Sequence, residues 1–556
     1  MPSDSYVCGI DFGTLSGRAV IVRASDGEEL GSAVHEYRHA VMDRKLTAHR
    51  DEVLPPEFAL QYPEDYVEVL KIAIPEAIRN SGVKPEQIIA VGTDFTSATM
   101  LPTDADGWPL CQRQEFAGRP HAYVKLWKHH GAQAEADQIL EVARRRGEPW
   151  LKRYGDTMSS EFALPKLLET FHADREVYDT MAHFVDAVDW IVWQLTGTYV
   201  RSAGATGYKA FFQDGRFPSK EFFAELDPDF ADVLTKLEAP VLQLGDKAGE
   251  ITEEAAAWTG LVPGTPVAVG NIDAHVTIPA GQGVENGQLT AILGTSGVYV
   301  VNSPELHEVP GMFGVADGGL VKGAWGYDAG QSAVGDLYAW FVNTCVPPAY
   351  HEEAAGRDIS LHQLLTEKAA DQEIGQHGLI ALDWHNGNRS ILVDANLSGL
   401  LIGQTLTTTP EDVYRAILES TAFGFRTIIE SFTAAGVEIN EVIAAGGLLK
   451  NAFLMQMFSD VTRKPLSLAV SGYAGALGAA IHGAVAAGVY PDVPAAAAAM
   501  GQKVPNAYLP NEAAAAEYDK LYAEYQELHD HYGRGGSKVM YRLKQLKREA
   551  MARKHG

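Results

Sequence analysis

Two turns rich in glycine and threonine are the residues of this sequence best suited to chemistry with phosphate. Gly13 and Thr14 follow one apolar run, and Gly294, Thr295 and Ser296 follow another. Glycine lets backbone N–H groups approach a phosphate chain without side-chain bulk, and the Thr or Ser hydroxyl adds a donor. No Gly-x-x-x-x-Gly-Lys-Ser/Thr motif is present, so neither turn is a P-loop. A single Gly-Thr turn is common, whereas two in corresponding places predict a phosphate-binding cleft.

Two aspartates at expected strand ends could complete such a site. Asp11 precedes the first turn, where a carboxylate needs a cation between itself and the phosphates. It is therefore a candidate Mg²⁺ ligand, directly or through water. Asp273 ends an apolar run and would point into the cleft, where it could accept a proton from a substrate hydroxyl and help to hold the metal. A helix N-cap is the alternative interpretation of Asp273.

A third motif could hold the base and ribose of a nucleotide. Gly446 and Gly447 end another apolar run, and Asn451 stands at the expected start of the next helix. Strand-end glycines let a flat ring lie on the backbone, and the Asn side chain could contact the base or ribose. An ordinary strand–turn–helix junction explains the same residues equally well.

The elements that must position these residues occur in two similar series. Strands are expected at 6–12, 18–23 and 29–37, antiparallel because short turns join them. A helix should follow that begins at Pro63, is kinked at Pro75 and ends just before Gly82. A further strand is expected at 87–91 and ends at Gly92-Thr93-Asp94. The second half is expected to repeat this plan, with strands at 288–293, 298–301, 441–445 and 466–470 and helices at 411–435, 451–461 and 475–487. The pattern predicts an α/β fold made by internal duplication.

The duplication sets the expected domains. The boundary falls near residue 285, and the largest insertion, about 102–261, lies in the first half. From residue 513 the chain is expected to be helical, with a basic stretch at 538–554. That stretch is either a solvated helix face or an inter-subunit contact, which leaves a homodimer open.

Composition excludes several classes of partner. The 556 residues hold 45 Lys and Arg against 72 Asp and Glu, a net charge of −27 that repels nucleic acid and anionic membranes. The three cysteines, Cys8, Cys111 and Cys345, fit no metal motif and are expected to be reduced. Residues 1–4 do not begin a signal peptide, so a cytoplasmic location is expected.

Taken together, the motifs resemble those of a known superfamily. Residues 11–14, 294–296 and 445–447 resemble the two phosphate motifs and the adenosine motif of the actin-like ATPases. Within that superfamily, the chain is similar over nearly its whole length to the FGGY carbohydrate kinases, and most similar to the members that phosphorylate L-ribulose. The most specific stretches are 94–102, 124–130, 207–209, 270–275, 330–341 and 382–389.

The resemblance implies a fold and ligands. It implies an α/β fold of two RNase H-like domains, residues 1–285 and 286–556, with a ligand cleft between them and a large insertion in the first. ATP and Mg²⁺ would bind in the cleft with a small-molecule sugar. The implied reaction is phosphorylation of the carbon-5 hydroxyl of L-ribulose in arabinose catabolism.

The resemblance also implies site residues. Asp273 matches the catalytic base, and Ser97, Trp127, Lys209 and Asp328 fall where the relatives contact the ketopentose. Position 328 is commonly Glu in those relatives, so the shorter Asp leaves another pentulose or pentitol open, such as xylulose, D-ribulose or ribitol. A nucleotide-switched binding protein of the chaperone or actin type is the alternative from a different class, and the sugar-type residues of the insertion argue against it.

Overall fold

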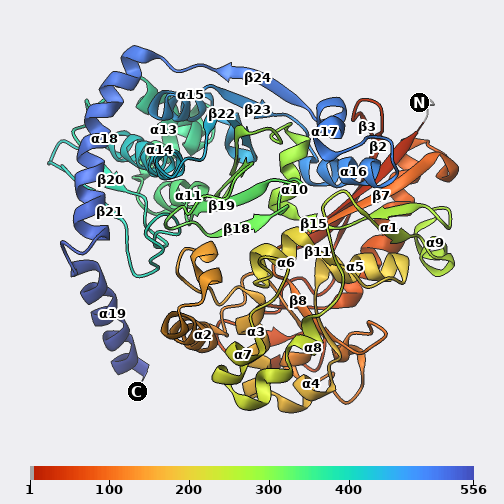
Figure 1. The fold of residues 1–556 in the computed structure, drawn as a ribbon. Helices are drawn as coiled ribbons and strands as arrows, with labels where there is room; N and C mark the ends of the chain where they lie inside the picture. Colours follow the sequence, from red (N-terminus) through yellow and green to blue (C-terminus); the bar gives the residue numbers. More distant parts are fainter. Residues whose placement is uncertain (1–4, 556) are drawn as a thin grey trace.

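The first sheet begins with the antiparallel strands that the sequence predicted. The computed structural model describes residues 5–555, and its first sheet has the order β13-β14-β7-β1-β2-β3, with β15 paired to β7 (Figure 1). Its strands are β1 (Tyr6–Phe12), β2 (Ser16–Arg23), β3 (Glu29–Glu36), β7 (Ile88–Phe95), β13 (Lys247–Glu250), β14 (Pro266–Ala268) and β15 (Asn271–Ile272). β1 is antiparallel to β2 and parallel to β7.

The second sheet repeats the same plan. Its order is β18-β19-β17-β16-β22-β23-β24, in which β16 is antiparallel to β17 and parallel to β22. Its strands are β16 (Gly287–Leu293), β17 (Gly297–Ser303), β18 (Gly314–Asp317), β19 (Trp325–Gln331), β22 (Ile439–Ala445), β23 (Leu466–Ala469) and β24 (Lys503–Tyr508). β16 and β17 occupy the places of β1 and β2, which confirms the predicted internal duplication. We call the part of the chain up to residue 281 the first unit and the part from β16 onward the second unit.

Two helices, one from each unit, pack against each other where the units meet. α10 (Asp273–Ala280) follows the first sheet, and α16 (Ala474–Ala486) packs on β1 and β7 of that sheet. Glycines make this close approach possible: an added Cβ on Gly9 would lie 1.8 Å from the Ala476 carbonyl oxygen, and one on Gly92 would lie 1.7 Å from that of Ala479. The sequence interpretation ended a strand at Gly92, but β7 continues to Phe95 because this glycine serves helix packing.

Other helices cover the sheets, and some were not predicted. α1 (Pro63–Ser81) runs through Pro75 without interruption and ends at Gly82, whose φ of 68° is left-handed. α14 (Pro410–Ala434) and α15 (Ala452–Thr462) agree with the expected helices of the second unit. The second unit also holds an unpredicted excursion with α11 (Gly335–Thr344), α12 (Pro348–Gly356), α13 (Leu361–Ala370), β20 (Ile380–Leu382) and β21 (Leu400–Ile402).

The large insertion of the first unit folds around its own core. A four-stranded sheet of β10, β8, β9 and β6 is surrounded by helices and packs around buried aromatic residues. β6 (Leu60–Gln61) and β8 (Met100–Thr103) lead into the insertion, which adds β9 (Val124–Lys125), α2 (Gln133–Arg146), α3 (Ala163–Ala173), α4 (Arg175–Thr180), β10 (His183–Asp186), α7 (Lys220–Leu226) and α8 (Leu234–Leu237). α5 (Ala187–Thr196) and α6 (Ala203–Lys209) also belong to the insertion, but their buried residues join the core of the first sheet. α9 (Glu253–Thr259) leads back to the first sheet.

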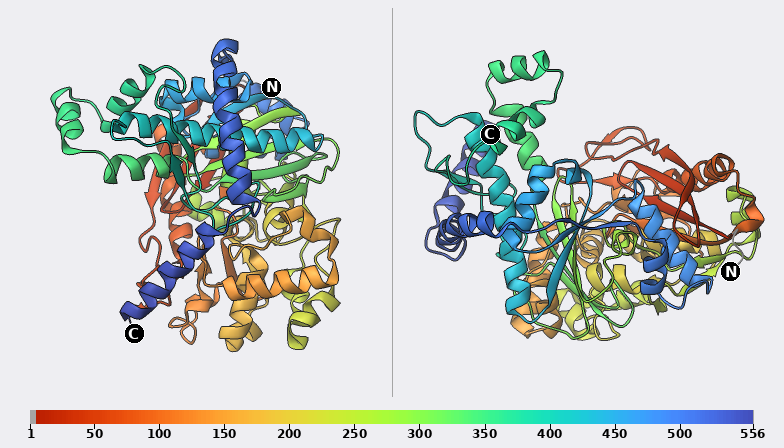
Figure 2. Two further views of the ribbon diagram at one scale, coloured as in Figure 1. Left: turned by 90° about the vertical axis from the view of Figure 1, so that its left-hand side faces the viewer. Right: turned by 90° about the horizontal axis from the view of Figure 1, so that it is seen from above.

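The chain ends in two long helices on one flank (Figure 2). α17 (Val493–Met500) and β24 lead to α18 (Glu512–Gly533), and α19 (Val539–His555) follows. None of the helices within residues 5–555 combines the length and the apolar character that crossing a membrane requires.

Candidate active site

Asp273 is the first residue of α10, directly after the strand end that faces the cleft. β15 pairs with β7, so that Asn271 lies opposite Asp94. The Ala274 N–H donates a hydrogen bond of 2.7 Å to the Asp273 carboxylate. Burial raises the pKa of Asp273 to about 7, and the negative charge of Asp11 contributes. A carboxylate with this pKa can take up a proton near neutral pH, as a general base requires.

Three carboxylates meet at the ends of adjacent strands. Asp11 on β1 lies opposite Asp94 on β7, and Arg18 on β2 forms an ion pair with Asp11 at 3.4 Å. Asp94 is fully buried, and neither of its carboxylate oxygens has a hydrogen-bond partner. Burial and the charges of Asp11 and Asp273 raise the pKa of Asp94 well above its usual value. Such a cluster is costly unless a cation or protons neutralise it.

These carboxylates suit a metal that arrives with phosphate. Within residues 5–555, no group of three or more His, Cys, Asp or Glu side chains is arranged to hold a metal ion alone. Mg²⁺ is usually held by one or two carboxylates together with substrate phosphates, so Asp11 and Asp273 fit a metal bound as MgATP. Asp94, whose two carboxylate oxygens have no hydrogen-bond partner, is a third carboxyl group beside Asp11 and Asp273.

The two Gly-Thr turns have matching geometry. The Gly13 N–H donates to the Ser16 carbonyl at 3.0 Å, and the Gly294 N–H donates to the Ser296 carbonyl at 3.0 Å. The Gly335 N–H at the start of α11 donates to the Gly294 carbonyl at 3.0 Å and so fixes the second turn. The exposed Thr295 hydroxyl is free to face a ligand.

The proposed adenosine motif adjoins the second turn. Gly446 has a φ of 100°, and an added Cβ would lie 2.4 Å from the Leu293 carbonyl oxygen. Gly447 borders open space. Asn451 caps α15, because its side-chain oxygen accepts a hydrogen bond of 3.0 Å from the Leu454 N–H. Its contact with a base or ribose therefore stays a prediction.

Two of the predicted sugar contacts lie together where the two units meet. Lys209 of the first unit and Asp328 of the second are 3.7 Å apart and almost buried. His275 Nε2 lies 3.5 Å from the same carboxylate. Burial alone would raise the pKa of Asp328, but the His275 hydrogen bond and the Lys209 charge lower it below the usual value. The Lys209 ammonium also lies 4.4 Å from the centre of the Phe313 ring.

One buried lysine holds the backbone beside both Trp127 and Ser97. Trp127 Nε1 donates a hydrogen bond of 3.2 Å to the Thr14 hydroxyl, which joins the predicted sugar and phosphate regions. Lys166 is fully buried and donates to the Ala98 carbonyl at 2.7 Å and to the Leu126 carbonyl at 2.8 Å. It thereby fixes the residues next to Ser97 and Trp127.

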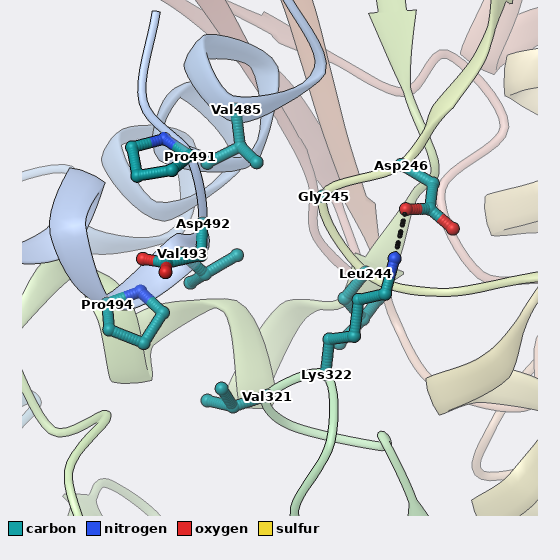
Figure 3. A pocket seen from close by; sticks show the side chains of 10 residues that line it. All are labelled: Leu244, Gly245, Asp246, Val321, Lys322, Val485, Pro491, Asp492, Val493 and Pro494. Carbon is teal, nitrogen blue, oxygen red and sulfur yellow. Dashed lines mark hydrogen bonds and ion pairs between the residues drawn. The ribbon is translucent and has the colours of Figure 1, made fainter. Parts of the chain in front are cut away.

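A pocket of about 620 Å³ runs between the two units. Trp127 lines it from the first unit, and Thr295, Ser296, Phe313 and Arg389 line it from the second. Of the predicted site residues, its lining includes Trp127, Thr295 and Ser296 but not Asp273, Lys209 or Asp328. A second pocket, of about 80 Å³ near the Lys322–Asp246 ion pair, is too small and includes none of these residues (Figure 3).

Comparison with known proteins decides the family. Residues 6–278 match the N-terminal domain of the FGGY family of carbohydrate kinases, and residues 289–487 match its C-terminal domain. The chain belongs to this family. The predicted resemblance is thereby confirmed, and ATP is the phosphate donor that FGGY kinases use.

Two curated relatives resemble this FGGY kinase over nearly its whole length. A ribulokinase of Mycolicibacterium smegmatis is 54% identical over 549 residues, 99% of this chain and 97% of the relative. A ribulokinase of Geobacillus thermodenitrificans is 48% identical over 558 residues, 99% of this chain and 98% of the relative. A solved xylulose kinase from Rhodospirillum rubrum has a TM-score of 0.76 at 23% identity, covering 94% of this chain and 98% of that one, which supports the fold alone.

Sequence reasoning missed several residues of this site. Arg18 and Asp94 stand opposite Asp11 on neighbouring strands, so strand register could have indicated them. Phe313 directly precedes β18, and no local signal indicated it. Arg389 lies in the stretch 382–389 that carried the family resemblance, but the sequence analysis gave it no role. Lys166 was given no role from the sequence.

Proposed function

We propose that this FGGY kinase is a ribulokinase that transfers the γ-phosphoryl group of ATP to the carbon-5 hydroxyl of L-ribulose, giving L-ribulose 5-phosphate. We place this reaction in cytoplasmic L-arabinose catabolism. The observation that carries the proposal is the identity of about half of all residues to ribulokinases over nearly the full chain. The charged sugar site of Lys209, Asp328 and His275 supports it, because a ketopentose offers hydroxyl and carbonyl groups to such residues.

Asp273 acts as general base in this proposal. Its carboxylate accepts the proton of the carbon-5 hydroxyl while that oxygen attacks the γ-phosphorus and the bond to the bridging oxygen of ADP breaks. The backbone N–H groups and hydroxyls of the two turns, with Thr14 and Thr295, stabilise negative charge on the transferred group. Lys209 and Asp328 orient the sugar, and the indole of Trp127 fixes its position beside Thr14.

Mg²⁺ has a defined place in the proposal. Asp11 would hold it, directly or through water, with Asp273 beside it, and it would neutralise charge on the phosphate oxygens. Arg18, which pairs with Asp11 at 3.4 Å, would hold the Asp11 carboxylate in one orientation.

A substrate panel tests the proposal. We expect kcat/KM to be highest with L-ribulose and at least about tenfold lower with D-ribulose, xylulose and ribitol, because unpaired buried charges penalise a wrong hydroxyl arrangement. Lys209→Met should raise the KM for L-ribulose while leaving the Kd for ATP unchanged. A higher kcat/KM with another pentulose would show that this other sugar is the substrate. An unchanged KM for L-ribulose in Lys209→Met would show that Lys209 does not contact the sugar.

A further inference from the structure

Two turns that carry predicted sugar contacts are held by the same helix. Ser97 lies in the turn between β7 and β8, and Trp127 lies in the turn that follows β9. A turn has no ladder of backbone hydrogen bonds, so its position depends on the elements to which it is bonded. Both turns are bonded to α3, whose residues Lys166 and Glu169 lie three apart and therefore on one face of the helix.

Lys166 joins the two turns to each other. Its Nζ donates hydrogen bonds to the Ala98 carbonyl at 2.7 Å and to the Leu126 carbonyl at 2.8 Å. These residues come directly after Ser97 and directly before Trp127. The Lys166 side chain is completely buried, so water does not compete for either carbonyl. The distance between the two turns is therefore set by one side chain of α3.

Glu169 holds the Trp127 turn at both of its ends. Its carboxylate accepts hydrogen bonds from Lys125 Nζ at 2.6 Å and from His129 Nε2 at 2.9 Å. These two donors stand two residues before and two residues after Trp127. Both donor side chains are 0% exposed. Lys125 Nζ also donates to the Lys166 carbonyl at 2.9 Å, which adds a bond to the backbone of α3.

His129 takes part in this network as a neutral donor. Burial lowers the pKa of His129 to about 4, so the ring is uncharged at neutral pH. Its Nδ1 accepts a hydrogen bond from the Ala59 N–H at 3.3 Å, which leaves the ring proton on Nε2 to donate to Glu169. A substitution that removes this donor therefore leaves the Lys125–Glu169 ion pair in place and changes no charge in the core.

The phosphate turn does not depend on this network for its own position. Trp127 Nε1 donates to the Thr14 hydroxyl at 3.2 Å, so the indole reaches that turn. The backbone of the turn is fixed separately, because Gln61 Nε2 donates to the Thr14 carbonyl at 2.7 Å. A change in the α3 network should therefore affect the binding of the sugar while the binding of ATP persists.

We propose that this face of α3 is a positioning device for the sugar, in which Lys166 and Glu169 hold both turns where their side chains can meet the pentulose. The inference rests on the proposed function and adds to it residues that do not themselves touch the substrate. Buried ionic groups are a costly way to stabilise a fold, since apolar side chains of similar volume often serve as well or better. Fixing two separate turns with directed hydrogen bonds is a task that apolar side chains cannot perform.

A second buried lysine in the insertion provides a matched control for Lys166. Lys236 is 6% exposed and donates to the Met181 carbonyl at 2.9 Å, which belongs to neither turn. Lys166→Met should raise the KM about tenfold and leave the Kd for ATP within about twofold of wild type. Lys236→Met should lower Tm, as Lys166→Met does, but leave the KM unchanged. The KM is measured with the pentulose that gives the highest kcat/KM in the substrate panel.

Variants of His129 test the same device without altering its charge. His129→Leu should raise this KM about fivefold, because the turn loses one of its bonds to α3. His129→Gln keeps an N–H that can reach Glu169 and should stay within about twofold of wild type. The effect should pass through Trp127, so in a chain that carries Trp127→Ala the further change His129→Leu should alter the KM by less than about twofold.

These outcomes are independent of which pentulose is the natural substrate, because any sugar that meets the two turns reports their position. If Lys166→Met does not fold, the His129 variants decide the matter. An unchanged KM in His129→Leu, or a failure of His129→Gln to restore it, would overturn the proposal. So would an equal rise of KM in Lys236→Met and Lys166→Met, which would trace the effect to a general loss of stability. Additive effects of His129→Leu and Trp127→Ala would also overturn it.

Discussion

At the scale of single residues, Asp273 shows how a group suited to catalysis can weaken the fold. Its pKa of about 7, against an ordinary 3.8, means that the folded protein binds the proton more tightly than the unfolded chain. The free energy of unfolding therefore falls as the pH rises from about 4 to about 7, and the full penalty remains above pH 7. Reactivity and stability are opposed at this carboxylate.

We predict that Asp273→Asn lowers kcat by about 10³-fold, since it removes the base, and raises Tm at pH 8 by about 2 °C, since it removes a buried charge. Calorimetry at pH 5 and pH 8 measures the second effect, which should shrink at the lower pH. ATP binding should persist.

Asp328→Asn is the matched control, because the pKa of Asp328 is lowered by His275 and Lys209. Here the charged form stabilises the fold above the ordinary pKa, so the variant should lower Tm at pH 8. A lower Tm in Asp273→Asn, or a turnover near that of wild type, would contradict the account of Asp273.

Much of the site could be predicted because its motifs are local. Gly13 with Thr14, close to Asp11 near the end of β1, and Gly294 with Thr295 each lie in one short turn whose residue types indicate phosphate. Partners from distant segments could not be predicted in this way. Lys166 reaches the Ala98 and Leu126 carbonyls only after the insertion has folded, so its role depends on tertiary structure.

At the scale of elements, the duplicated plan could be predicted from the sequence, but the end of β7 could not, because of a glycine inside that strand. Alternating apolar runs indicated the strands of both sheets. A glycine inside a strand looks like a turn in the sequence, yet Gly9 and Gly92 allow α16 to lie directly on the sheet. The α16 residues that they meet lie 467 residues after Gly9 and 387 residues after Gly92, beyond the reach of local pattern.

We predict that Gly9→Ala lowers the free energy of unfolding by about 2 kcal/mol or more, because the new Cβ would lie 1.8 Å from a backbone oxygen that cannot rotate away. Urea unfolding measures the change. Gly356→Ala is the control, since no atom lies within 4 Å of its added Cβ. That exposed helical position should be neutral or slightly stabilised. Equal losses in both variants would show that α16 does not depend on the close approach.

At the scale of the whole molecule, both units contribute residues to the proposed sugar site. Arg389 of the second unit lies 3.6 Å from Glu161 of the first, and its guanidinium lies 4.6 Å from the centre of the Phe313 ring. The Lys209–Asp328 ion pair also joins the two units. Binding of sugar and nucleotide should therefore draw the units together and exclude water from the reacting phosphate.

We predict that Arg389→Met raises the KM for the sugar about tenfold, reduces the compaction that both ligands produce in small-angle X-ray scattering, and leaves the Kd for ATP unchanged. Lys152→Met is the matched control, because Lys152 pairs with Glu308 across the same two units at 3.2 Å but on the exposed surface. An exposed pair contributes little, so this variant should behave as wild type. If both variants lost compaction equally, closure would depend on the total charge between the units. If neither variant lost compaction, closure of the units would not depend on the Arg389–Glu161 ion pair, and Arg389 would affect only the binding of the sugar.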